Sequence, residues 1–300
     1  MDTAPIPVPS DDTVPVKLPR WVQRDDPGDP DSAAFRSGAA LMALDVALRA
    51  PGLPAPLLRD RLALRTAEAC LRRAGRPERL PELRDEVHLL REGESPGPGG
   101  AVFLDWRRAT RLRLGPGWEA RARQVLPDLP APADLPLAPV ARAAALLAAC
   151  LEAAPRAQVP GLILAEATLS AALGWTHPLP LLAGHLNRAD LREPAQLLPA
   201  CQRAVIAAAN EALPLAEELT RRAARLAQVA PKLRAKASDA VVALFLAEDA
   251  VSPARALTPV IRGSRHPMTD RAARRICDRL VSLGAVRELS GRDTFRIYGL

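Results

Sequence analysis

The last 62 residues of the chain, Asp239 to Leu300, constrain its fold most strongly, because apolar periodicity, turn residues and charge agree there. Apolar residues recur at helical spacing in the first ten of these residues, and Ser238 is expected to be the N-cap of that helix. A short second helix is expected after Pro253. Thr269 is predicted to cap a longer third helix, which should end at Gly284.

Two short segments of alternating residues close the chain, Val286–Leu289 and Thr294–Tyr298. They flank a Ser-Gly-Arg-Asp turn, in which Gly291 permits a tight reversal. Three helices followed by a hairpin predict a winged helix-turn-helix over residues 237–300, with the hairpin as the wing.

The remainder of the sequence predicts helical bundles, so that the expected fold class is mainly α. Ala/Leu-rich segments are separated by Pro and Gly, and helices are expected over residues 32–49, 56–74, 81–91, 101–114, 140–154, 161–173, 179–186 and 196–230. We predict a disordered Pro/Asp-rich leader (1–31), an N-terminal helical domain (32–126), a Pro-rich linker (127–139), a central helical domain (140–236) and the winged helix domain (237–300).

Charge is distributed unevenly along the chain, whose formal net charge is +7. Residues 219–300 contain 16 Arg or Lys and 7 Asp or Glu, a net charge of +9, which leaves −2 for residues 1–218. A basic C-terminal part favours an anionic partner. The sequence contains no uninterrupted apolar run of 18 residues, the length that a membrane-spanning helix needs. We therefore expect a cytoplasmic protein without a membrane partner.

Signals for enzymatic chemistry are sparse. The four cysteines lie far apart, which predicts reduced thiols and neither a disulfide framework nor a metal site. His177 and His185 are too widely spaced to share a helix face as metal ligands. The sequence contains no nucleophile elbow and no phosphate-binding glycine loop. We therefore expect no catalytic residue, cofactor or metal.

The third predicted helix of residues 237–300 is amphipathic, with Ala272, Ile276, Leu280 and Leu283 on one face. A helix fits the major groove of DNA, where arginine binds guanine bidentately, so double-stranded DNA is the predicted partner. The candidates for contacts with base edges are Arg271, Arg274 and Arg275. The candidates for phosphate contacts are Ser264, Arg265, Thr269, Arg287, Arg292 and Arg296.

Residues 33–45 (AAFRSGAALMALD), 229–236 (VAPKLRAK) and 269–300 resemble a bacterial family known as domain of unknown function 1403, over nearly the whole chain. The wing entry, LGAVRELSGR, is similar to the winged helix that follows the catalytic domain of many Fic-type proteins. Fic catalysis requires a His-Pro-Phe motif followed by an acidic residue and Gly-Asn-Gly-Arg. Here His177-Pro178-Leu179 precedes apolar residues, so the resemblance implies a degenerate relative without nucleotide transfer.

Three functional hypotheses follow. The first is a non-enzymatic DNA-binding protein, a regulator or an accessory factor of a mobile element, whose helical body forms a homo-oligomer. The second is an adaptor that binds proteins through its body and wing. The third is a degenerate Fic-like protein, or an unrecognised enzyme with a polar pocket between its helical domains.

Overall fold

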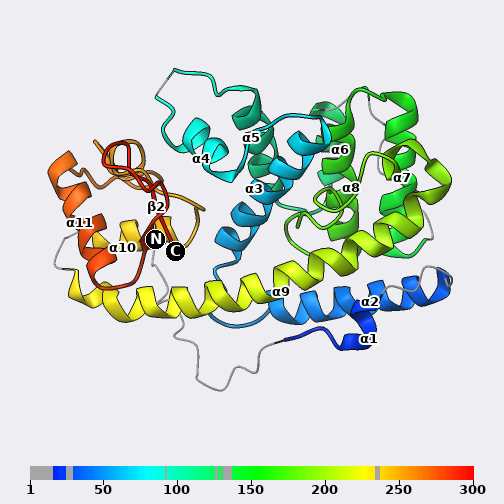
Figure 1. Cartoon of the computed structure of the whole chain (residues 1–300), viewed down its shortest axis with the longest axis horizontal. Coiled ribbons are helices and arrows are strands. Elements are labelled where there is room, and N and C mark those ends of the chain that lie inside the picture. The colour runs from blue at the N-terminus through cyan, green and yellow to red at the C-terminus, as the bar shows by residue number, and fades with distance from the viewer. Residues whose placement is uncertain are drawn as a thin grey trace.

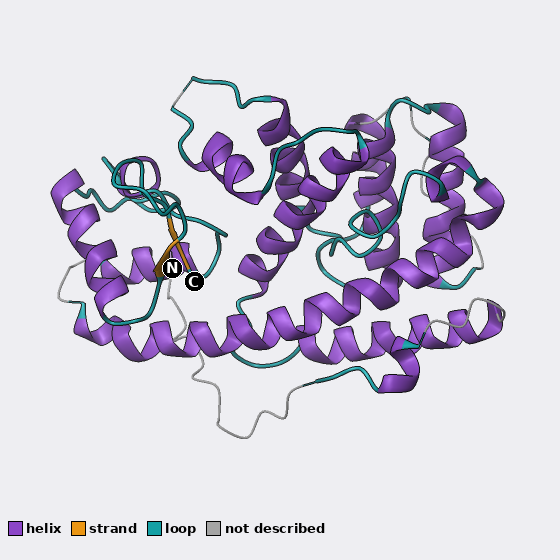
Figure 2. Cartoon of the chain, viewed as in Figure 1, coloured by secondary structure: helices purple, strands orange, loops and turns teal. Residues whose placement is uncertain are grey.

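The computed structural model describes residues 16–24, 30–91, 93–125, 128, 130, 137–233 and 237–300. Within these residues the protein is mainly helical, with a two-stranded antiparallel sheet close to the C-terminus (Figures 1 and 2). The predicted mainly α class is therefore confirmed. None of the helices in this part of the chain combines the length and the apolar character that crossing a bilayer requires.

The helices before residue 233 form the body of the protein. They are α1 (Arg20–Gln23), α2 (Pro30–Leu48), α3 (Ala55–Arg73), α4 (Leu80–His88), α5 (Pro98–Arg111), α6 (Trp118–Val125), α7 (Pro139–Ala153), α8 (Gln158–Ala172), η1 (Asp190–Arg192), η2 (Pro194–Gln196), α9 (Leu197–Val229) and η3 (Ala230–Lys232). Most of the predicted helices have a counterpart among these. The sequence did not indicate α6.

Helix α9 is the longest element, and at 33 residues it spans about 50 Å. It runs along the long axis of the molecule, with α2 beside it and α7 crossing it (Figure 1). Its buried side chains, including Leu219 and Leu226, follow helical spacing, and Pro214 is contained within the helix on an exposed position. The body is thus assembled around one helix that contributes to the core along its whole length.

The prediction of a helix over residues 179–186 is wrong, because the structure has an irregular segment there. The buried carboxylate of Glu166 accepts hydrogen bonds from three consecutive backbone N–H groups, residues 181–183, at 3.0, 2.7 and 2.9 Å. Pro178 and Pro180 supply no N–H group at all. A side chain of α8 therefore takes the donors that a helix would use.

Two helix starts also differ from the prediction. Helix α10 begins at Ser238 itself, whose hydroxyl donates to the carbonyl of Leu233 at 3.2 Å, so Ser238 is not the N-cap. Helix α5 begins at Pro98, three residues before the start predicted at residue 101. Proline is favourable in the first turn, because the missing N–H group would have no helical acceptor there.

Part of the predicted leader is described, and it packs against the body. Residues 16–24 contain α1, with Leu18 and Val22 buried against the core. The ring of Trp21 stacks on Phe35 of α2, with 5.5 Å between the ring centroids. Residues 1–15 and 25–29 of the leader, and most of the predicted linker at 127–139, lie outside the described residues.

One apolar core extends from Leu18 to Leu300 and includes residues of α2, α3, α7, α9 and the C-terminal helices. The N-terminal, central and C-terminal segments predicted from the sequence therefore share buried surface. Their boundaries as separate domains stay predictions.

The C-terminal part contains α10 (Ser238–Phe245), the short helix η4 (Pro253–Leu257), α11 (Asp270–Ser282), β1 (Arg287–Glu288) and β2 (Tyr298–Gly299). In the antiparallel pair Glu288 lies opposite Tyr298, and Val251 forms a bridge to Tyr298 from the other side. Three extended segments thus lie in the order Val251, β2, β1. Both paired strands are shorter than predicted.

Candidate nucleic-acid interface

Helix α11 is the third helix predicted for residues 237–300, and contacts at both of its ends hold it in position. The hydroxyl of Thr269 accepts the N–H of Ala272 at 3.4 Å, so the predicted N-cap is present. Gly284 follows the helix with φ +65°, as a helix-ending glycine should. At this end Arg225 of α9 donates to the carbonyl of Leu283 at 2.9 Å. Both ends of α11 are therefore fixed.

The buried face of α11 consists of Ala273, Ile276, Cys277 and Leu280. The sequence predicted that this face begins at Ala272. Ala272 is only partly buried, and the buried face begins one residue later, at Ala273. This face packs on η4, and α11 lies at one end of the molecule (Figure 1). The opposite face of the helix points away from the body.

Arg271, Arg274 and Arg275 lie on that outer face and are exposed. Spacings of three and four residues place them on one side of the helix. Arg265 is exposed in the turn that precedes α11. Among the residues that the structure describes, no ion pair involves any of these four arginines. Their charge is therefore available to an anionic partner.

The arginines of the hairpin have different surroundings. Arg292 forms a bidentate pair with Asp85 of α4, with N–O distances of 2.5 and 2.7 Å, and also donates to the carbonyl of Phe295. Arg296 lies 3.6 Å from the carboxylates of Glu288 and Asp293. The hairpin is consequently held against the body by Arg292.

Arg287, the remaining hairpin candidate, is exposed on β1. Burial lowers the pKa of the Arg61 guanidinium on α3, and the nearby charge of Arg287 lowers it further. The hairpin therefore approaches the body at α3 as well as at α4.

A buried network of charged residues joins the C-terminal part to the body, and sequence reasoning missed it. Asp249, fully buried between α10 and η4, accepts from Arg84 at 2.5 and 3.2 Å and forms an ion pair with Arg61. Arg61 also donates to the carbonyl of the buried C-terminal residue, Leu300, at 3.0 Å. Burial alone would raise the pKa of Asp249, but the charges and hydrogen bonds of Arg61 and Arg84 hold it below its ordinary value.

The network continues through Asp60 of α3. Its carboxylate accepts from Arg107 at 2.8 Å and from the backbone N–H of Asp249 at 2.8 Å. Arg107 also lies 3.3 Å from Glu248, which accepts a hydrogen bond from Arg262 at 2.8 Å. The adjacent acids at 248 and 249, in an otherwise basic region, were the only sequence signal of this network.

His88 is buried beside the network, 6.3 Å from the ring of Phe103 between centroids. Neither ring nitrogen has a hydrogen-bond partner within the described residues. Burial, followed by the charge of Arg107, holds the pKa of His88 well below its ordinary value, so the ring is neutral at physiological pH. It is therefore a buried, neutral residue of the core.

The two histidines of the irregular segment lie in different cavities. His177 lines a cavity with residues of α2 and α3, and its Nδ1 lies 2.9 Å from the hydroxyl of Thr176. His185 lines another cavity with residues of α3 and α9, near Glu211. No group of three or more His, Cys, Asp or Glu suited to a metal ion occurs in the described part of the chain.

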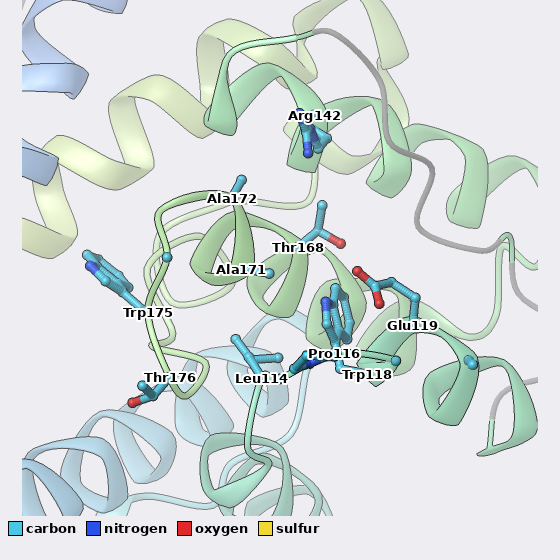
Figure 3. A pocket seen from close by; sticks show the side chains of 14 residues that line it. Leu114, Pro116, Trp118, Glu119, Arg142, Thr168, Ala171, Ala172, Trp175 and Thr176 are labelled. Carbon is cyan, nitrogen blue, oxygen red and sulfur yellow. The ribbon is translucent and has the colours of Figure 1, made fainter.

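A cavity lined by residues of α6, α7 and α8 has a volume of about 710 Å³ (Figure 3). In this view Trp175 lies on the left and Trp118 to its right, with Thr168 and Arg142 above Trp118 and Glu119 beside it. The hydroxyl of Thr168 is buried and makes no hydrogen bond with the described residues. None of the described lining residues is His or Cys. The cavity can hold a small molecule, but its described lining offers no nucleophile paired with a base.

The fold and this geometry define a mainly helical protein with an exposed basic helix close to its C-terminus. The chain belongs to the family described as "Protein of unknown function (DUF1403)", whose model matches residues 7–300. The family resemblance inferred from the sequence is thereby confirmed, whereas the similarity to the winged helix of Fic-type proteins stays a prediction. No curated protein and no solved structure matches the chain.

Proposed function

We propose that the protein binds double-stranded DNA without catalysing a reaction, and that residues 237–300 act as a winged helix-turn-helix with α11 as the recognition helix. The single observation that carries the proposal is the outer face of α11, where three exposed arginines have no ion-pair partner among the described residues. Surface arginines of this kind can bind a phosphate or a guanine without first breaking an existing ion pair.

The order of elements supports this assignment. Helix α10, the short helix η4 and α11 precede the β1–β2 hairpin, and Val251 pairs with β2 between the first two helices. This is the order of helices and strands in a winged helix. Arg271 and Arg275 lie four residues apart, about 6 Å along the axis, which fits within a major groove about 12 Å wide.

Different roles follow for the other candidate residues. Thr269 uses its hydroxyl oxygen as the N-cap acceptor, so its O–H group remains free to donate to a phosphate at the N-terminus of α11. Arg265 and Arg287 are exposed and keep their proposed role as phosphate contacts. Arg292 is proposed to anchor the wing to Asp85, and Arg296 contacts DNA only if it leaves the neighbouring carboxylates.

The test compares the wild type with an Arg274→Ala/Arg275→Ala variant in the full chain, because buried charges join residues 237–300 to the body. Binding of a fluorescent mixed-sequence duplex is followed by anisotropy over a series of salt concentrations. We expect the double variant to bind at least about tenfold more weakly. If both side chains contact phosphates, the slope of log Kobs against log salt should also fall by about 2.

The matched control is Arg91→Ala/Arg108→Ala, which removes the same charge from exposed positions of the body. It should bind DNA as the wild type does. Equal binding by the α11 variant and the wild type would remove α11 from the interface. A wild type without measurable DNA affinity would instead favour the adaptor hypothesis.

We also propose that the body self-associates through α2. Phe35, Met42 and Val46 are 70%, 63% and 45% exposed and share one side of that helix by their spacing. Gly38 lies between them with open space above its Cα. Two antiparallel copies of α2 would place each Met42 over Gly38 of the second copy. A dimer of this kind presents two α11 helices, as a two-fold symmetric DNA site requires.

A further inference from the structure

A smaller cavity, of about 230 Å³, lies between the C-terminal end of α2, the first turns of α3 and the irregular segment that follows α8. The residues that line it include Asp45, Arg49, Arg59, Thr176 and His177. It lies in the body, away from the end of the molecule that carries α11 (Figure 1). A ligand here is therefore distinct from DNA bound to α11.

Arg59 is the unusual residue of this cavity. Its Nε is inaccessible to solvent and has no hydrogen-bond acceptor, and no ion pair with another described residue engages its guanidinium. The adjacent carboxylate of Asp60 is occupied by Arg107 and by the backbone of Asp249. Burial, and then the charge of Arg111, lower the pKa of Arg59. A half-buried cation without an acceptor is costly unless a ligand supplies one.

The other charged side chains of the described lining, Asp45 and Arg49, pair with each other. Asp45 is the carboxylate of its lining, and it already accepts from Arg49 at 2.8 and 3.0 Å and from the indole N–H of Trp175 at 2.9 Å. Burial lowers the pKa of His177, and the charges of Arg59 and Arg113 lower it further. Among the described lining residues Arg59 is therefore the cation without an ion pair, while the carboxylate of Asp45 is already satisfied.

We propose that this cavity binds the phosphate group of a small phosphorylated molecule, with Arg59 as the principal cationic contact. Arg49 and the Nε2–H of His177 are the remaining donors around it, and the hydroxyl of Thr176 orients the His177 ring by donating its proton to Nδ1. Several donors from different directions suit a tetrahedral phosphate better than a planar carboxylate. The volume is below the range of about 300 to 1,000 Å³ typical of drug-sized ligands, so a phosphorylated three- or four-carbon molecule fits better than a nucleotide.

The test uses the full chain and two probes, inorganic phosphate and glycerol 3-phosphate, with acetate as the carboxylate arm. Thermal unfolding is followed by circular dichroism at neutral pH and constant ionic strength while each probe replaces chloride. A ligand that binds only the folded state raises the midpoint in a saturable manner. We expect saturable stabilisation by both phosphates, stronger for glycerol 3-phosphate, and none by acetate.

Arg59→Gln should weaken phosphate binding by about tenfold or more, because a charged donor is lost. The control Arg65→Gln changes an arginine of the same helix outside the cavity and should bind as the wild type does. Thr176→Val provides a second variant that keeps all charges and should also weaken binding. Both cavity variants should retain the DNA affinity of the wild type, which separates this proposal from the function proposed for α11.

Three results would overturn the assignment. The first is a wild type that no phosphate stabilises in a saturable manner. The second is equal affinity for phosphate in the wild type, Arg59→Gln and Thr176→Val. The third is stabilisation by acetate as strong as that by phosphate, which would reject the phosphate chemistry.

Discussion

Replacing Asp249 with Asn is the sharpest test of how the C-terminal part is joined to the body. Asp249 is fully buried, and its carboxylate meets Arg61 of α3 and Arg84 of α4. The substitution keeps the shape of the side chain and removes its charge. Arg61 and Arg84 then remain in a poorly solvated site with a neutral partner, although Arg61 still donates to the carbonyl of Leu300.

The expected cost follows from that burial. Breaking a buried ion pair by removing one partner destabilises a protein by about 3 to 5 kcal/mol. Asn retains one oxygen acceptor, so we expect the lower end, about 3 kcal/mol. A typical domain has a total stability of about 5 to 15 kcal/mol, so this is a substantial fraction.

The measurement is urea unfolding of the full chain at neutral pH, followed by circular dichroism. Asp105→Asn is the control, because Asp105 is exposed and its pair with Arg108, at 3.1 Å, is a surface ion pair. Such pairs contribute about 0 to 1 kcal/mol. If Asp249→Asn costs no more than this control, the network does not hold the two parts together and the reasoning is refuted.

The pH dependence of the same difference is a further check. The pKa of Asp249 is held below its ordinary value in the folded protein. Its contribution to stability is therefore complete above the unfolded pKa of about 3.9 and disappears as the pH falls through the folded pKa. The difference between the wild type and Asp249→Asn should be constant near neutrality and shrink in strong acid.

Two further predictions concern the body. Burial raises the pKa of Glu166 to about 7 although three backbone N–H groups oppose it, so the folded state holds a proton that the unfolded state has released. Stability should fall by about 3 kcal/mol as the pH rises from about 4.3 to about 7, and Glu166→Gln should remove this dependence in urea unfolding; an unchanged dependence would contradict the assignment. For self-association, light scattering after size-exclusion chromatography should find a concentration-dependent dimer that Phe35→Asp abolishes. Phe295→Asp, at a 66% exposed position in the hairpin, should leave it intact, and a wild type that stays monomeric at every concentration would exclude the α2 interface.

Most local structure followed from the sequence by itself. Apolar residues at helical spacing located α2, α3, α9 and α11, because burial of one helix face requires that spacing whatever the partner is. Thr269 and Gly284 marked the ends of α11, since capping and a left-handed backbone are properties of single residues. The exposed face of α11 followed from the same periodicity.

Tertiary structure alone decided the remaining features, since they depend on residues far apart in the chain. The partner of Arg292 lies 207 residues away, and that of Arg84 lies 165 residues away. The same holds for residues 179–186. An apolar run predicted a helix there, but the buried carboxylate of Glu166 on α8 accepts the hydrogen bonds of the backbone N–H groups. Charge patterns indicate how many arginines are present, but folding determines which of them reach a carboxylate and which remain available to a ligand.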